Sequence, residues 1–199
     1  MTEYIVKEIT ENLDKIFANV DRESIEVYRF LKSEYEKGNI LDNYLFQFVY
    51  RSFYRLDSAG LSEKIKTRYF ELLSEKQNDL EIILSELYDI PNLKDKNSIQ
   101  FSFATKLLHT LDNDNPIYDK NVDRVIRIKI DGKTKDEKIR SSVDMFNSLI
   151  IVYSEMMEKD EIIDAILRFR MYFNVQKEKV SDVKVLDFII WTLGKMKSS

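Results

Sequence analysis

The helical spacing of apolar residues, which runs through almost the whole chain, constrains the fold more than any other feature. Ile5, Ile9, Leu13 and Ile16 follow the three-and-four spacing of a helix with one apolar face. Similar spacing continues toward the C-terminus, and the 199 residues include only four glycines and two prolines. So few glycines and prolines favour long helices joined by short turns. No segment alternates strongly enough to require a sheet. We therefore expect an all-α protein of many helices, arranged as two small helical lobes around a cleft.

The expected helix boundaries follow from capping residues and turn composition. Asn97 and Asp119 are candidate N-caps, because their side chains can accept hydrogen bonds from the first backbone amides of a helix. The segment 41–56 is dense in aromatic residues, which predicts a central, largely buried helix. The turn around Pro91 separates an N-terminal helical part, 1–95, from a second helical part, 96–199, in what we expect to be one compact unit. After a first helix that carries Ile5 to Phe17, the predicted helices lie near 22–37, 41–56, 62–73, 77–87, 97–111, 119–130, 136–158, 160–173 and 182–196.

Several classes of site are excluded by residue counts. The chain has no cysteine, which removes disulfides, thiolate nucleophiles and cysteine metal sites together. His109 is the single histidine and cannot build a multi-histidine metal centre. No phosphate-binding glycine loop or dinucleotide fingerprint is present. We therefore expect neither a metal nor a cofactor.

The distribution of apolar residues also bears on location. Leu149 to Tyr153 is among the longest apolar runs and is far too short to span a bilayer. The first eight residues interleave charges and lack the apolar block of a signal peptide. We expect a cytoplasmic protein without a membrane partner, whose oligomeric state stays open.

Basic residues are concentrated in one segment of an acidic chain. The net charge is −4, whereas positions 120–140 hold eight basic and four acidic residues. A local basic strip of this kind is compatible with docking one backbone segment of DNA, and Arg124 and Arg127 are its candidate binding residues. The same strip is equally typical of a solvated pair of helices.

Lys106 and Asp119 are the candidate catalytic residues. Lys106 lies near the middle of the predicted helix 97–111, and Asp119 opens the next helix with the pattern Asp-x-x-Val-x-Arg-Val. Partial desolvation would lower the pKa of such a lysine, and only a neutral amine can attack a sugar carbon. The alternative for Lys106 is a surface lysine whose stem lies along apolar neighbours. Asp119 is expected to cap its helix in either case.

Two segments, 103–109 and 116–125, resemble the lysine and aspartate region of the helix-hairpin-helix DNA glycosylases, the superfamily of endonuclease III and 8-oxoguanine glycosylase. The resemblance implies a glycosylase-like fold that excises a damaged or modified base from DNA. It implies that Lys106 forms a Schiff base with the deoxyribose, and that Asp119 stabilises positive charge on the sugar as the base departs. The sequence departs from the family where Gln100 to Ala104 replaces the hairpin glycines, and these residues also suit an unbroken helix.

Further residues are candidates for binding. Ser102 and His109 share a helix face with Lys106, and Tyr118 adjoins Asp119. Trp191 could stack on an extruded base. The alternatives are that Trp191 belongs to the core and that His109 is a buried histidine with satisfied hydrogen bonds.

Three functions remain open from the sequence. The first is a DNA glycosylase, with or without a lyase step. The second is a catalytically silent relative that binds nucleic acid or a nucleoside in the same cleft. The third is an all-helical protein–protein interaction domain in which the motif is coincidental.

Overall fold

Residues 1–198 fold into helices and connecting loops. The structure, a computed structural model, describes residues 1–198 and contains ten helices and no strand over that range. This confirms the predicted all-α class. The helices are α1 (Thr2–Asn19), α2 (Arg22–Glu36), α3 (Tyr44–Phe53), α4 (Glu63–Ser74), α5 (Leu80–Tyr88), α6 (Phe101–Leu111), α7 (Lys120–Ile126), α8 (Lys135–Met157), α9 (Asp160–Phe173) and α10 (Asp182–Met196). Over residues 1–198, none of them is long and apolar enough to cross a membrane.

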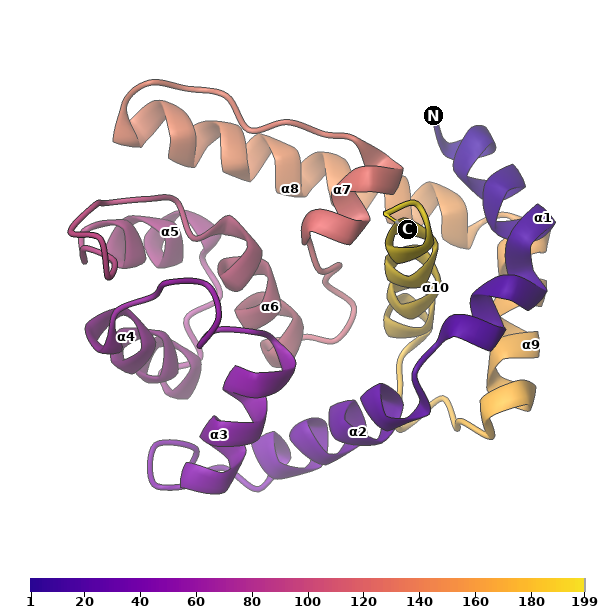
Figure 1. Cartoon of the computed structure of the whole chain (residues 1–199), viewed down its shortest axis with the longest axis horizontal. Coiled ribbons are helices and arrows are strands. Elements are labelled where there is room, and N and C mark those ends of the chain that lie inside the picture. Colours follow the sequence, from indigo (N-terminus) through magenta and orange to yellow (C-terminus); the bar gives the residue numbers. More distant parts are fainter. Residues whose placement is uncertain (199) are drawn as a thin grey trace.

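The buried apolar side chains form two clusters. One joins α1, α7, α9 and α10, so that helices from both ends of the chain pack together. The other joins α3, α4, α5 and α6. The long helices α2 and α8 contribute to both clusters and run along opposite margins of the molecule in Figure 1. The segment between α6 and α7 therefore lies where the two clusters meet.

Side-chain caps explain where several of these helices begin. Asp119 accepts hydrogen bonds from the amides of Asn121 and Val122 at 2.8 and 3.0 Å, which confirms its predicted role as the N-cap of α7. Thr134 forms a reciprocal capping box with Glu137 at the start of α8. Both caps are made by neighbouring residues; the Asp119 cap was predicted from the sequence, whereas the Thr134 capping box was not.

The predicted end of α7 and the predicted start of α6 are wrong. Helix α7 ends at Ile126 and not near residue 130, because Arg127 adopts a left-handed conformation with φ of 58°. Helix α6 begins at Phe101, so Asn97 does not cap it. The Asn97 side-chain amide instead donates to the Tyr88 carbonyl at the end of α5. This hydrogen bond caps the C-terminal end of α5. The sequence around Asn97 does not indicate that role.

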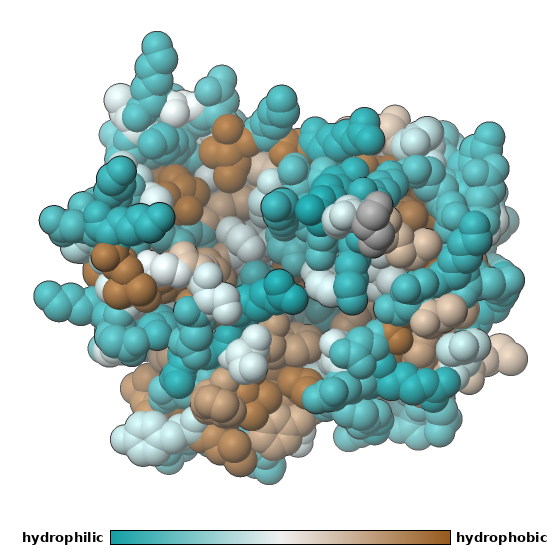
Figure 2. Space-filling model, in the orientation of Figure 1, coloured by the Kyte–Doolittle hydropathy of each residue, from teal (hydrophilic) through white to brown (hydrophobic). Residues whose placement is uncertain are grey.

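The aromatic helix predicted at 41–56 is shorter and less buried than expected. Phe46 and Tyr50 are fully buried, whereas Tyr44 is 77% and Phe48 61% exposed. Figure 2 shows an apolar surface at its lower edge, where Figure 1 places α3. Helix α3 lies at the margin of its cluster and packs only one face, so the prediction of a central helix is wrong.

Helices α7 and α10 approach one another very closely at Gly194. A Cβ atom at this position would lie 1.9 Å from the Asn121 carbonyl oxygen, far inside van der Waals contact. Only glycine lets α10 pack against the first turn of α7 at this separation. The packing of Gly194 thereby sets the place of the α7 N-terminus, which carries Asp119.

Replacing Gly194 by alanine tests this packing. Alanine in an unhindered helix position stabilises by about 1 kcal/mol relative to glycine. We expect Gly194→Ala to destabilise instead, by about 2 kcal/mol or more, because α7 must move away from α10. Urea unfolding followed by circular dichroism measures the difference. A variant more stable than the wild type would contradict the close approach.

Candidate active site

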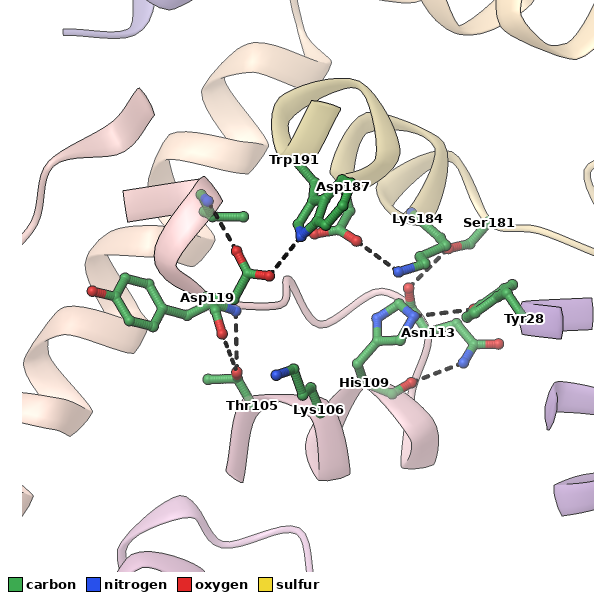
Figure 3. A network of polar contacts seen from close by, with 12 residues as sticks. Tyr28, Thr105, Lys106, His109, Asn113, Asp119, Ser181, Lys184, Asp187 and Trp191 are labelled. Atoms are coloured by element: carbon green, nitrogen blue, oxygen red, sulfur yellow. Dashed lines mark hydrogen bonds and ion pairs between the residues drawn. The ribbon is translucent and has the colours of Figure 1, made fainter. Parts of the chain in front are cut away.

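A cavity of about 610 Å³ lies where α2, α3, α6, α7 and α10 converge. This size is typical of a small-molecule or nucleotide site. Both candidate catalytic residues, Lys106 and Asp119, line it. Figure 3 shows them on facing segments, with α10 covering one side. The remaining lining residues are Val20, Asp21, Ser24, Phe53, Tyr54, Arg55, Ser102, Ile117, Lys120, Asn121, Arg124, Lys184, Asp187, Phe188, Trp191, Thr192 and Lys195.

Lys106 is a buried amine without an acidic partner. The residue is 8% exposed, and its Nζ donates to Ser102 Oγ at 3.0 Å and to the Tyr54 carbonyl at 3.4 Å. The Phe103 ring lies 4.8 Å from Nζ. Within residues 1–198, no carboxylate forms an ion pair with this amine. Burial lowers the pKa of Lys106 to about 8, so roughly a tenth of the amine is neutral at pH 7.

Asp119 is held by three donors from two helices. Its Oδ1 caps α7, and its Oδ2 accepts a hydrogen bond of 2.6 Å from Trp191 Nε1 on α10 (Figure 3). Such a carboxylate is fixed in orientation and its negative charge is well compensated. That charge acts on Lys106 and opposes part of the effect of burial on the lysine pKa. The negative charge of Asp119 therefore stabilises the protonated form of Lys106.

A second buried lysine lines the same cavity and differs in its partner. Lys184 and Asp187 form an ion pair of 2.6 Å on α10, with the two residues only 3% and 4% exposed. Burial raises the pKa of Asp187, which the Lys184 ammonium opposes. This pair was not predicted from the sequence, although a lysine and an aspartate at i and i+3 interrupt an apolar helix. Lys184 is thus tied to a carboxylate, whereas Lys106 is not.

His109 serves the structure and does not line the cavity. It is fully buried, and its Nδ1 donates to the Asn115 carbonyl at 2.7 Å. Its Nε2 then accepts from the Tyr28 hydroxyl at 3.0 Å. Burial lowers the pKa of His109 to about 3, so the ring is neutral at physiological pH. Both ring nitrogens are occupied, which leaves none to contact a ligand.

Of the other predicted binding residues, three line the cavity and two do not. Ser102, Arg124 and Trp191 line the cavity. Tyr118 does not: its ring packs against Phe101 with centroids 5.0 Å apart. Arg127 is exposed at the end of α7, also outside the lining.

Trp191, the candidate platform for a base, also holds Asp119. Its indole N–H is engaged by Asp119, and Lys195 Nζ lies 5.5 Å from its ring centroid. The indole therefore positions a carboxylate while lining the cavity. Stacking on a base would have to use the part of the ring that Lys195 leaves open.

The cavity is basic although the protein is acidic. Its lining includes six cationic residues (Arg55, Lys106, Lys120, Arg124, Lys184 and Lys195) and three acidic ones (Asp21, Asp119 and Asp187). From the basic segment 120–140, only Lys120 and Arg124 contribute. Lys135 instead pairs with Asp89 at 2.6 Å. Two residues of the basic segment therefore contribute to the positive charge of the cavity lining.

Searches against protein-family models, curated proteins and solved structures found no match to this chain.

The stability of the protein should depend on pH through Lys106. Below about pH 8 the folded and unfolded states both carry the ammonium, and its burial costs roughly 3 kcal/mol. From pH 8 to about 10.5 the folded state is neutral while the unfolded state stays protonated, so this cost disappears as pH rises. Lys106→Met lacks the ionisable group.

We therefore expect Lys106→Met to be more stable than the wild type at pH 7, with a difference that shrinks by roughly 3 kcal/mol between pH 8 and 10.5. Urea unfolding of both proteins across this range gives the difference directly, and other titrating groups cancel in it. A difference independent of pH would contradict the buried amine.

Proposed function

We propose that the protein is a DNA glycosylase with an associated lyase step, which removes a damaged or modified base. One observation carries the proposal: a buried amine without a carboxylate partner, Lys106, lines the same basic cavity as the anchored carboxylate of Asp119. A carboxylate and an amine beside one sugar suffice for this chemistry, without a cofactor. The resemblance of segments 103–109 and 116–125 to the helix-hairpin-helix glycosylases supports the same assignment.

Asp119 acts in the first step, the loss of the base. The bond between C1′ and the base nitrogen breaks, and the electron pair leaves with the base, which takes up a proton. Positive charge then develops on C1′ and the ring oxygen, as in other glycosidic cleavages. The Asp119 carboxylate stabilises that charge and needs little reorganisation, because Trp191 and the α7 amides already hold it in place.

Lys106 acts as the nucleophile. The neutral Nζ forms a bond to C1′ and releases a proton to solvent. The bond between C1′ and the ring oxygen then breaks, the oxygen takes up a proton, and a protonated Schiff base results. Loss of a C2′ proton and departure of the 3′ phosphate cleave the strand, and water releases the amine. The pKa of Lys106, lowered to about 8 by burial, favours the attacking form.

Lys184 is a poorer candidate nucleophile despite its burial. Its Nζ is an ammonium paired with the Asp187 carboxylate at 2.6 Å. An ammonium has no electron pair for attack on a sugar carbon. Together, Lys184 and Asp187 add no net charge to the wall of the cavity.

The second candidate function is a catalytically silent protein that binds nucleic acid in this cavity. It is favoured by the start of α6, where residues 101–111 form one uninterrupted helix without glycine. The glycine hairpin that lets backbone amides approach a phosphate in the glycosylase family is absent from this segment. This departure from the family weakens the resemblance on which the catalytic assignment partly rests.

Borohydride trapping on DNA with an abasic site separates the two functions. We expect the wild type to form a covalent adduct, because borohydride reduces a Schiff base irreversibly. Peptide mapping of the adduct should locate it on Lys106 and not on Lys184. Lys106→Ala should abolish trapping while its circular dichroism spectrum stays that of the folded protein.

Asp119→Asn provides the complementary test. Asparagine caps a helix about as well as aspartate, so the fold is expected to persist. Base release should slow by 10²-fold or more, as when one electrostatic stabiliser is removed from other active sites. Trapping on a preformed abasic site should be affected less, because the base has already left. Absence of any adduct with the wild type would support the silent protein.

A further inference from the structure

Four cations at the cavity lack acidic partners. Arg55, Lys120, Arg124 and Lys195 all line it, and none forms an ion pair with a carboxylate within residues 1–198. Other cations near Arg55 do have acidic partners. Arg51 and Lys66, which lie near Arg55, both pair with Asp57, at 3.2 and 2.9 Å. These four cations at the cavity are therefore available to an anionic ligand.

Arg55 stands apart from the other three. It follows α3, whereas Lys120, Arg124 and Lys195 belong to α7 and α10, which pack together. Figure 1 shows α3 below α6, and α7 and α10 above and to the right of it. The cations therefore approach the cavity from two sides.

The backbone places Arg55 next to the candidate nucleophile. Arg55 adopts a left-handed conformation with φ of 60°, which costs a non-glycine residue on the order of 1 kcal/mol or more. The carbonyl of the preceding residue, Tyr54, accepts a hydrogen bond from Lys106 Nζ at 3.4 Å. Beside the dominant effect of burial, the positive charge of Arg55 also lowers the pKa of Lys106. One short turn thus holds both the amine and an unpaired guanidinium.

We propose that Arg55 binds the DNA phosphate on one side of the sugar that Lys106 attacks, while the α7–α10 cations bind the backbone on the other side. A guanidinium matches the oxygens of a phosphate with two parallel hydrogen bonds. Two sets of cations flanking one buried amine suit a strand that crosses the cavity with one nucleotide turned inward. This inference rests on the proposed function for the identity of the ligand.

The test compares Arg55→Asn with Arg51→Gln. Asparagine tolerates the left-handed conformation, so Arg55→Asn removes the charge without disturbing the turn. Arg51 lies four residues earlier, is paired with Asp57 and does not line the cavity, which makes it a matched control. Arg55→Lys retains charge but loses the two-pronged geometry.

Binding is measured by fluorescence anisotropy on a labelled DNA duplex that carries a tetrahydrofuran abasic-site analogue, from about 50 to 200 mM salt. We expect Arg55→Asn to weaken binding roughly tenfold at the lowest salt. It should also reduce the log–log salt slope by about 0.9, the value for one phosphate contact. Arg55→Lys should keep most of the slope, and Arg51→Gln should match the wild type.

The outcomes distinguish this inference from the proposed function. Wild-type affinity and slope in Arg55→Asn, or an equal loss in Arg51→Gln, would overturn the phosphate contact even if borohydride trapping succeeds. If trapping fails but Arg55→Asn still lowers the slope, the contact stands and the protein binds DNA without cleaving it. A wild type that does not bind the duplex at the lowest salt would overturn the inference as well.

Discussion

The burial of the Lys106 amine without a carboxylate partner is the constraint on which the site depends. An ammonium in this position loses most of its hydration and receives only a hydroxyl, a carbonyl and aromatic rings in return. The fold therefore keeps a group that destabilises it near neutral pH, a pattern common at functional sites and rare in a purely structural core. Lys184, only a short distance along the cavity wall, has its carboxylate and shows that the fold can satisfy a buried lysine.

The rest of the architecture serves to bring a fixed carboxylate to that amine. Asp119 depends on the first turn of α7 for two hydrogen bonds and on Trp191 of α10 for the third. The close approach of Gly194 to Asn121 holds these two helices at the required separation. Helix α10 is in turn packed against α1, so both ends of the chain support one side of the cavity. The other side, from α3 and α6, carries the amine and Arg55.

The sequence predicted those features that depend on neighbouring residues. Apolar spacing predicted the all-α fold, and the hydrogen-bonding capacity of Asp119 predicted its cap. Features set by tertiary contacts were missed or wrong. Nothing local indicates that Arg127 turns left-handed and ends α7, or that α3 lies at a margin with Tyr44 exposed. The Lys184–Asp187 pair and Arg55 could not be assigned to the site from the sequence. They line it only because α3, α6 and α10 converge on one cavity, which is a tertiary arrangement.

The pKa of Lys106 tests this account most directly. Lysine ε-carbon resonances can be followed by NMR as a function of pH, and the Lys106 signal is assigned by its loss in Lys106→Met. We predict that the Lys106 signal titrates near pH 8, well below the ordinary lysine value of 10.5. A Lys106 signal that titrates near 10.5 would mean that the amine is hydrated or paired. It would contradict both the buried amine and the nucleophile assigned to it.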